Sequence, residues 1–474
     1  MTKLGEPVRV GARNGENTRH SGVLSAFFSR EDGTMTIFSI YMFLIMIIMG
    51  GLGVDLIQNE MERTQLQHTV DRAVLAAADL DQELDPTAVV NDYFDKSGMA
   101  SYLTSVTVSE GLNYRTVTAA AETETETRFM RLVGVDELIV PAIGTAEERI
   151  SNVEISMILD ISGSMGWNNK MSRLQTAARE FVDTVIKDPS ENKISVSLIP
   201  YTAQVNAGPD LFYRFNTTQD HDFSHCVDFE ISDFDLTALS FSKQYEQMQH
   251  FETGWSYSNP ISNPGCPQQT YERIVPFSQD TTALKATINQ YRARANTAIH
   301  LGMKWGVAML DPAFRPVNQW LATNGKINNA FSVRPADYDD DDTLKTIVLM
   351  TDGQNVDTIR IQPWYYNSDS ERYHWSRYPL YWYLNNYVWG SWNNWRYTKY
   401  SSLQADNMLD KICTAAKNKG MVVWSVGFEV TDYSAGVMEN CASTPSHFFR
   451  VEGIEISDAF DAIAKQINQL RLTQ

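Results

Sequence analysis

A run of twenty residues without a charged side chain constrains this chain more than any other feature. The run is MTIFSIYMFLIMIIMGGLGV, residues 35–54. As a helix it would be about 30 Å long, which matches the hydrocarbon core of a bilayer. A signal peptide is disfavoured because the apolar run is too long and lacks an A-x-A cleavage site. A buried core helix would rarely avoid every charge over this length, so the sequence predicts a transmembrane helix over residues 35–54.

Flanking charges predict the orientation of this helix. The preceding segment, residues 1–34, carries five basic residues, whereas acidic residues follow the run, beginning with Asp55, Glu60 and Glu62; the basic residues are Lys3, Arg9, Arg13, Arg19 and Arg30. The positive-inside rule then makes residues 1–34 a cytoplasmic tail and puts residues 55–474 outside the cytoplasm. An oxidising exterior allows the four cysteines to form disulfides. Four cysteines permit three pairings, of which we expect the two local ones, Cys226–Cys266 and Cys413–Cys441.

Residues 55–150 read as a helix followed by a small antiparallel sheet. Leu66, Val70 and Val74 share one helical face in the segment that continues the apolar run. Three strand-like segments follow, and the strict alternation in TETETET is typical of a half-exposed strand. A long N-terminal helix that leads into a small sheet is a pilin-like plan.

From residue 151 to residue 474 the pattern changes to alternating strands and helices. The apolar segments VEISMIL, ISVSLIPY, TIVLM and MVVWSVGF are typical of buried strands. An amphipathic helix with Leu174, Ala177 and Phe181 on one face lies between the first two. This alternation predicts an α/β domain with a doubly wound, mostly parallel sheet.

Two segments interrupt the alternation, residues 202–280 and residues 364–400, and we expect both to be loop-rich insertions. The second contains fifteen Trp or Tyr in 37 residues. These rings either pack together as a small accessory core or form an exposed platform for a partner. The candidate partner-binding residues are Trp382, Trp389, Trp392, Trp395, Tyr383 and Tyr387.

Hydroxyl and carboxylate side chains follow the strands of this domain. Asp160, Ser162 and Ser164 come directly after VEISMIL, Asp352 follows TIVLM, and Thr297 precedes a helix. Because ligands of open parallel sheets bind beyond the carboxyl ends of the strands, we expect these five residues to meet at one edge. Hard oxygen ligands without sulfur suit a divalent cation, with Mg²⁺ as the first choice and Mn²⁺ and Ca²⁺ as alternatives.

The alternate spacing of residues 160, 162 and 164 predicts a tight turn that Gly163 permits. Together DISGSM, Thr297 and TDG at 352 resemble the metal-ion-dependent adhesion site of a von Willebrand factor A (VWA) domain, over about residues 152–472. The resemblance implies that Ser162 and Ser164 touch the metal directly and that Thr297 does so directly or through water. Asp160 and Asp352 would act mostly through water, and a carboxylate from a partner would complete the site.

The N-terminal region resembles TadE/TadG-like proteins of Flp (Tad) pilus assembly, on the segments REDGTMTIFSIYMF, VDLIQNEMERTQLQHTVDRAVLAAADL and RFMRLVGVDELIVPAIGTAEE. CTAAKNKGMVVWSVGF resembles TadG-type proteins that carry a VWA domain. The resemblance implies a bacterial inner-membrane protein whose bulk is periplasmic or is exposed at a pilus tip. Type IV pilins are cut after a Gly and carry Glu at the fifth mature position. Here Gly33 would be the cleavage site and Phe38 stands fifth, so an uncut anchor and a tip subunit both stay open.

The leading functional hypothesis is a non-enzymatic adhesion protein of the Tad pilus, whose partner is a pilus component or a surface protein or glycan that offers a carboxylate. A stationary inner-membrane assembly factor is the alternative. A metal-dependent hydrolase is disfavoured because no nucleophile–base pair accompanies the metal-ligand pattern. Nucleic acid is an unsuitable partner because the net charge is −19 and no basic stripe alternates with aromatic residues.

Overall fold

The computed structural model describes residues 32–79, 82, 84–110, 114–149, 152–340 and 342–473. The chain divides into two compact units, Met1–Glu148 and Arg149–Gln474, which we call unit 1 and unit 2. Residues 1–31 of the expected cytoplasmic tail lie outside the described part of the chain. Residues 32–34 are already helical, so the helix begins before the predicted boundary.

One continuous helix, α2 (Asp32–Ala78), runs through unit 1. Among the described residues it is the one helix that is long and apolar enough to cross a membrane. Its second half buries Leu66, Val70 and Val74, because the spacing of three to four residues places these side chains on one face. The same helix therefore carries the apolar run and contributes to the core of unit 1.

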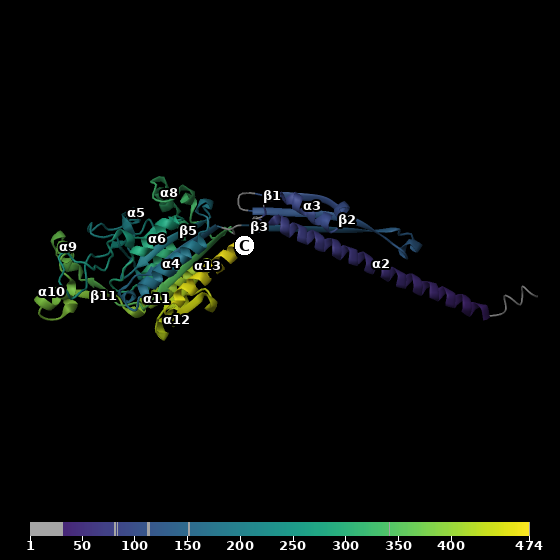
Figure 1. Ribbon diagram of the computed structural model, residues 1–474. Helices are drawn as coiled ribbons and strands as arrows, with labels where there is room; N and C mark the ends of the chain where they lie inside the picture. The colour runs from purple at the N-terminus through teal and green to yellow at the C-terminus, as the bar shows by residue number, and fades with distance from the viewer. Residues whose placement is uncertain are drawn as a thin grey trace, which may run out of the picture. The chain divides into compact units, whose positions relative to one another are not determined.

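A three-stranded sheet and a short helix complete unit 1 (Figure 1). The strands, in the order β1–β2–β3, are Leu103–Glu110, Tyr114–Glu126 and Glu137–Arg149. Helix α3 (Pro86–Lys96) begins at a proline, and Asp85 caps it by accepting the N–H of Ala88. Alternate residues of β2, Val117 and Ala119, are buried in the same cluster as the inner face of α2.

A six-stranded sheet with the order β13–β12–β9–β4–β5–β8 forms the centre of unit 2. In chain order its strands are β4 (Asn152–Asp160), β5 (Ile194–Tyr201), β8 (Val275–Ser278), β9 (Thr343–Thr351), β12 (Val422–Phe428) and β13 (Phe448–Val451). Neighbouring strands are parallel except at the edge, where β8 runs antiparallel to β5. The sheet is therefore mixed, and unit 2 has the α/β character that the sequence predicts.

Helices pack on both faces of this sheet, which explains why its central strands are apolar throughout. Met157 and Leu159 of β4 are buried with one set of helices, whereas Ile158 is buried with the other set. The first set is α4 (Lys170–Val185), α6 (Thr281–Gln290) and α13 (Glu455–Thr473). The second set is α7 (Ile299–Ala308), α11 (Ser402–Asn418) and α12 (Asp432–Cys441).

Both insertions contain more regular structure than the sequence suggests. Residues 202–280 include α5 (Gly208–Phe212), the ribbon of β6 (Val227–Asp228) and β7 (Glu246–Gln247), and β8 of the main sheet. Residues 364–400 include α9 (Asp369–Trp375), α10 (Leu380–Tyr387) and β11 (Arg396–Tyr400), which pairs with β10 (Thr358–Ile361). The prediction of a loop-rich second insertion is thus wrong for its two helices, because densely spaced aromatic residues obscured their helical period.

The remaining elements are helix α8 and short 3₁₀ turns. Helix α8 covers Arg315–Thr323. The 3₁₀ turns are η1 (Ala100–Tyr102), η2 (Met130–Val133), η3 (Gly163–Gly166), η4 (Pro189–Glu191), η5 (Ile231–Asp235), η6 (Thr270–Glu272), η7 (Pro312–Phe314), η8 (Asn329–Val333), η9 (Pro363–Tyr365), η10 (Trp392–Asn394) and η11 (Pro445–His447). Both predicted disulfides, Cys226–Cys266 and Cys413–Cys441, are confirmed, and all four sulfurs are buried.

Candidate functional site

The carboxyl ends of β4 and β9 lie side by side in the middle of the sheet. The chain continues from β4 to β5 on one side and from β9 to β12 on the other. The strand order therefore reverses its direction between β4 and β9. This reversal leaves room beyond the two strand ends, because the two connecting segments run to opposite sides. Asp160 is the last residue of β4, and Asp352 directly follows Thr351, the last residue of β9.

Asp160 is fully buried at this edge of the sheet. One carboxylate oxygen accepts the backbone N–H of Ser162 at 2.7 Å, and the other accepts the hydroxyl of Thr351 at 2.8 Å. Burial and the negative charge of Asp352 raise the pKa of Asp160 to about 6. Two carboxylates therefore approach each other here with incomplete compensation of their charge.

The turn after β4 packs against residues 293–298, which precede α7. Arg294 donates its backbone N–H to the carbonyl of Ile161 at 3.0 Å, and Gly163 donates to the carbonyl of Ala295 at 3.1 Å. A Cβ built on Gly163 would lie 2.9 Å from that carbonyl oxygen. Gly163 is therefore required by the close approach of another backbone segment, a reason that the sequence did not reveal.

Hydroxyl groups connect the three loops at this edge. The Oγ atoms of Ser162 and Ser164 lie 3.0 Å apart, and Ser164 donates to Asp352 Oδ1 at 2.5 Å. Thr297 reaches the same place, since a Cβ built on Gly353 would lie 3.7 Å from Ser164 Oγ and 3.9 Å from Thr297 Oγ1. The structure thus brings the predicted residues of all three loops together.

Lys170, the first residue of α4, directs its ammonium group to the same edge. Its Nζ lies 3.1 Å from Asp352 Oδ2 and 3.5 Å from Glu429 Oε2, and the side chain is nearly buried. Sequence reasoning missed Lys170. A sequence signal was available, since Lys170 lies one turn before Leu174 on the apolar face of the predicted helix. A lysine on a buried face requires a carboxylate partner, so this position indicates a buried ion pair.

The side chains at this edge fit a hard divalent cation. They offer hydroxyl and carboxylate oxygens without sulfur, and both carboxylates are buried, with Lys170 paired to that of Asp352. Within the described residues no cluster of three or more His, Cys, Asp or Glu side chains is placed to hold a metal, so hydroxyl ligands would be essential. If such a cation binds here, Ser162, Ser164 and Thr297 would hold it, and Asp160 and Asp352 would supply negative charge beside them.

A cavity of about 170 Å³ adjoins Thr297. Its walls come from the loop that carries Thr297, from residues 251–254 of the first insertion, and from residues 356–360, which lead out of the β9 end. Glu252 orders the wall from the first insertion, because its carboxylate accepts the backbone N–H groups of residues 262 and 263 at 2.9 and 2.7 Å. The predicted edge therefore opens into a space that the first insertion and residues 356–360 border.

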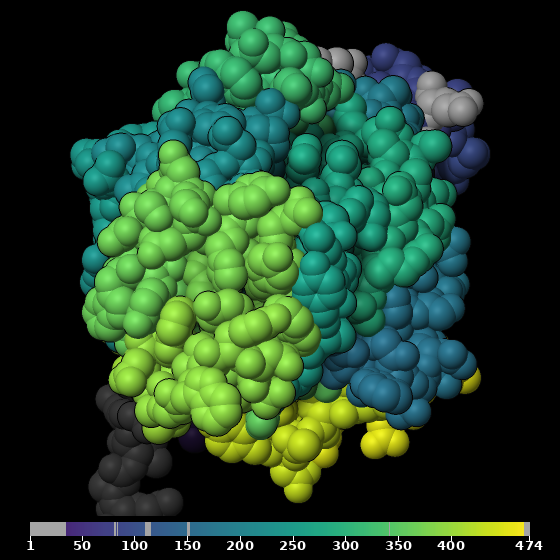
Figure 2. Space-filling model, turned by 90° about the vertical axis from the view of Figure 1, so that its left-hand side faces the viewer, coloured from purple at the N-terminus to yellow at the C-terminus, as the bar shows by residue number. Residues whose placement is uncertain are grey.

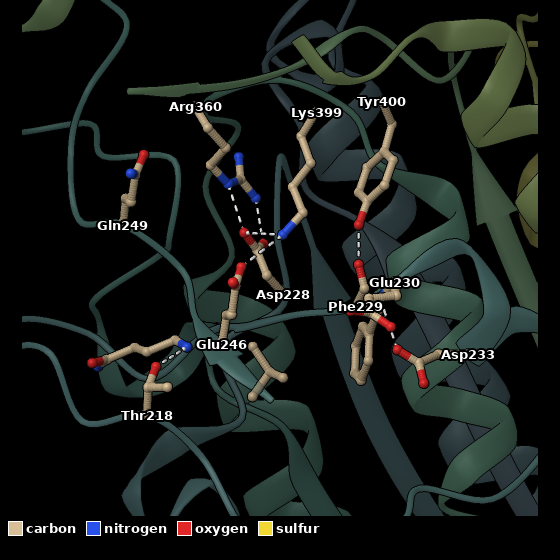
Figure 3. Close-up of polar contacts among 12 residues, drawn as sticks. Thr218, Asp228, Phe229, Glu230, Asp233, Glu246, Gln249, Arg360, Lys399 and Tyr400 are labelled. Carbon is tan, nitrogen blue, oxygen red and sulfur yellow. Dashed lines mark hydrogen bonds and ion pairs between the residues drawn. The ribbon is translucent and has the colours of Figure 1, made fainter. Parts of the chain in front are cut away.

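A buried ionic network ties the two insertions together (Figure 3). Asp228 of β6 lies between Arg360 of β10, which donates to Asp228 Oδ2 at 2.8 Å, and Lys399 of β11, which lies 3.0 Å from the same oxygen. Burial by itself would raise the pKa of Asp228, but Arg360 and Lys399 outweigh it and hold that pKa well below its usual range. Tyr400 adds a hydrogen bond to the carbonyl of Phe229.

The aromatic candidates of the second insertion fall into two groups. Trp382, Trp392, Trp395 and Tyr383 are partly buried among other rings, and Trp395 stacks on Tyr365 with centroids 4.0 Å apart. Trp389 and Tyr387 are instead 97% and 59% exposed. Residues 364–400, light green in Figure 2, cover much of the face shown there. The second insertion is therefore an accessory core that also presents exposed rings. Sequence reasoning missed two further exposed rings of this insertion, Trp364 and Tyr373, and the exposed Trp255 of the first insertion.

Residues 33–80 match a pilus-assembly family. Its description is "Putative Flp pilus-assembly TadE/G-like", and the match covers α2 from Gly33 onward but no part of unit 2. Among curated proteins, none matches this chain.

Solved structures with some similarity include three pilus proteins. The vWF domain of the type V pili tip protein Mfa5 from Porphyromonas gingivalis is 15% identical, covers 68% of this chain and 96% of its own, and has a TM-score of 0.36. The adhesive tip pilin GBS104 from Group B Streptococcus agalactiae is 12% identical, with coverages of 67% and 100% and a TM-score of 0.31. The pilus adhesin RrgA from Streptococcus pneumoniae is 13% identical, with coverages of 78% and 49% and a TM-score of 0.32. At these values the similarities carry no argument about this chain.

Proposed function

We propose that this protein is a membrane-anchored, pilus-associated interaction protein that binds a carboxylate of its partner through a divalent cation, Mg²⁺ first of all. The observation that carries the proposal is the convergence of Ser162, Ser164, Thr297 and Asp352 around the end of β4. The strand order and the helices on both faces support interpretation of unit 2 as a doubly wound VWA domain with a metal-ion-dependent adhesion site.

The chemistry of such a site favours binding rather than catalysis. Neutral hydroxyls as direct ligands leave much of the charge of a divalent cation uncompensated, so a carboxylate from a partner completes both the coordination and the charge. The cavity beside Thr297 gives room for the groups next to that carboxylate. A hydrolase would in addition need a positioned base and would be revealed by divalent-metal-dependent turnover.

The pilus context rests on the TadE/G-like match of residues 33–80 and on the apolar helix. We place the N-terminus in the cytoplasm and the disulfide-bonded unit 2 in the periplasm or at a pilus tip. A stationary assembly factor of the inner membrane is the second candidate. A tip subunit would be recovered in sheared filaments after cleavage at Gly33, whereas a stationary factor would stay in the envelope with its N-terminus intact.

The metal site is tested by replacing both Ser162 and Ser164 with Ala. Calorimetric titration with Mg²⁺ and Mn²⁺ should show binding to the wild type and none to the double variant, because the two hydroxyls are direct ligands in this proposal. The fold should survive, since these side chains lie at the end of the strand and little apolar area is lost.

A matched control is the Ser240→Ala, Ser242→Ala variant. These serines have the same spacing, and their Oγ atoms also lie 3.0 Å apart, but they belong to the first insertion. The control should bind metal like the wild type. Equal metal binding by all three proteins would refute the site.

The exposed rings of the second insertion are a second contact for the same partner. Trp389 is almost wholly exposed, and exposed Trp and Tyr side chains are enriched where proteins bind partners. An adhesion assay that includes Trp389→Ala beside the serine variants separates the two surfaces. If adhesion survives the loss of metal binding but not the loss of Trp389, the aromatic surface is the main binding site.

A further inference from the structure

The loop between β2 and β3, residues 127–136, packs against α2 within unit 1, and we call it the hairpin tip. The ring of Phe129 rests on Gly51, where a Cβ would lie 2.2 Å from the ring. One turn further along, buried Asp55 accepts the backbone N–H groups of residues 128, 129 and 130 at 3.1, 2.8 and 2.7 Å. The hairpin tip is therefore fixed to two successive turns of the helix, as the course of β2 beside α2 in Figure 1 illustrates.

The contact with Gly51 lies inside the uncharged run of residues 35–54. At 1.5 Å per residue, Gly51 is about 6 Å nearer to the middle of the run than Asp55. Asp55 does not mark the point where the helix enters water, because the hairpin tip buries its carboxylate. Leu56 and Ile57 beyond it are 55% and 64% exposed, and Glu60 is the first exposed charged residue. The apolar surface of α2 thus extends past the run, at the level of the hairpin tip.

The hairpin tip carries apolar side chains of its own. Leu132 and Val133 are 69% and 56% exposed. Arg128 and Arg131 on either side of Met130 are also exposed, and Arg131 pairs with Asp136 at 3.1 Å. Exposed apolar residues flanked by arginines are typical of segments that lie at the interface between lipid and water.

The backbone of the hairpin tip is bonded in a way that suits a place with little water. Besides the three N–H groups that Asp55 accepts, Leu132 donates to the carbonyl of Phe129 at 3.0 Å. Gly134 and Val135 donate to the carbonyls of residues 131 and 130 at 3.2 and 3.1 Å. Backbone groups in contact with lipid need such partners within the protein, since the lipid offers none.

We infer that the hairpin tip is a second membrane contact, which inserts Leu132 and Val133 into the lipid–water interface of the leaflet from which α2 emerges. This inference rests on the proposed membrane anchoring by residues 35–54. Lipid is the occupant that the position favours, because the same turns of α2 that hold the hairpin tip belong to the apolar run or directly follow it. The contact would hold unit 1 at the membrane surface.

The test measures the depth of single labelled positions in the full chain. All four cysteines are in disulfides, so one introduced cysteine is the only free thiol. Three variants of one residue type, Leu44→Cys, Leu132→Cys and Leu84→Cys, are labelled with an environment-sensitive fluorophore. They are reconstituted in vesicles of phosphatidylcholine and phosphatidylglycerol. The leucines are 50%, 69% and 65% exposed, and Leu84 follows the far end of α2.

Lipids brominated near the headgroup or near the chain end then quench the label according to its depth. We expect the chain-end lipid to quench position 44 most strongly, the headgroup lipid to quench position 132 most strongly, and neither to quench position 84. Quenching at 44 with none at 132 overturns the inference and leaves the anchor intact. No quenching at 44 refutes the anchor and the inference together. A label at 132 that lipid does not quench, and whose emission shifts as the protein-to-lipid ratio rises, assigns the hairpin tip to a second copy of the chain.

Discussion

At the scale of single residues, the edge of the sheet holds a lysine among the proposed cation ligands. Lys170 directs its ammonium group to Asp352 and shares it with Glu429. A buried carboxylate needs a positive partner, and Lys170 is the partner of Asp352. Lys170 therefore compensates part of the negative charge that a bound cation would also compensate. The lysine and a divalent cation would therefore compete for the carboxylate of Asp352, although each of them alone would stabilise its negative charge.

Replacing Lys170 with Met is expected to lower the free energy of unfolding of the metal-free protein by about 3–5 kcal/mol, because it leaves the buried carboxylate of Asp352 without its ion-pair partner. Saturating Mg²⁺ should restore part of this loss, since a ligand that binds only the folded state stabilises it. Urea unfolding with and without Mg²⁺ measures both effects.

Lys285→Met is the matched control for this variant. Lys285 forms an exposed ion pair with Asp183 at 2.6 Å, and its loss should cost less than about 1 kcal/mol. A Lys170 variant that loses no more stability than this control, or that gains nothing from Mg²⁺, would contradict the role given to Lys170.

Four of the five residues that the sequence predicted at this edge lie in short motifs at the ends of apolar strands, DISGSM and TDG, whereas Thr297 precedes a helix. The roles of Thr351 and Lys170 were not predicted, although Thr351 is the first residue of TDG. Thr351 is the last residue of a buried strand and contributes its hydroxyl to Asp160 across the sheet, a contact that depends on the pairing of β4 with β9. The contact of Thr351 depends on the register between β4 and β9, so the sequence by itself could not predict it, whereas Lys170 could have been noticed as a cation on the apolar face of its helix.

At the scale of elements, the buried Asp228 pair joins strands that are far apart in the chain. Asp228 lies in the first insertion, Arg360 lies in β10 just before the second insertion, and Lys399 lies near the end of that insertion. In an unfolded chain aspartate titrates near about pH 4, whereas in the folded protein the pKa of Asp228 is lower. The resulting stabilisation is present above pH 4 and is lost as the pH falls through the folded-state value.

Asp228→Asn should therefore make the free energy of unfolding less dependent on pH below about pH 4. At neutral pH the same substitution should lower the free energy of unfolding by about 3–5 kcal/mol. Guanidinium unfolding at a series of pH values measures both effects. Asp235→Asn is the control, because Asp235 pairs with Lys411 at the surface. An Asp228 variant with the same acid dependence as the wild type would exclude this aspartate as a source of acid sensitivity.

The sequence revealed some elements of unit 2 more readily than others. The central parallel strands are continuous apolar runs because helices cover both of their faces, and such runs are easy to recognise. Strand β8 has only four residues and lies at an edge, so its burial pattern is too short to read. In α10, polar positions are few and aromatic residues lie on several sides, which removes the contrast that a helical period needs.

At the scale of the whole molecule, the topology and the disulfides are linked. A reporter that is active only in the periplasm, fused after residue 474, should be active, because the positive charges precede the apolar run. Non-reducing peptide mapping of protein from the same cells should recover both disulfides. Activity of a cytoplasm-only reporter at that position, or four thiols open to alkylation, would reverse the proposed orientation.

Helix α2 continues without interruption from the apolar run into the buried core of unit 1. Successive residues of a helix are separated by about 100° of rotation, so the packing of Leu66 and Val70 fixes the direction in which every side chain of the apolar run points around the helix axis. Torque or tension applied to the core of unit 1 would be transmitted to the apolar run through the hydrogen-bonded turns of one continuous helix, because no flexible segment separates the two. The core of unit 1 and the apolar run therefore rotate as one body.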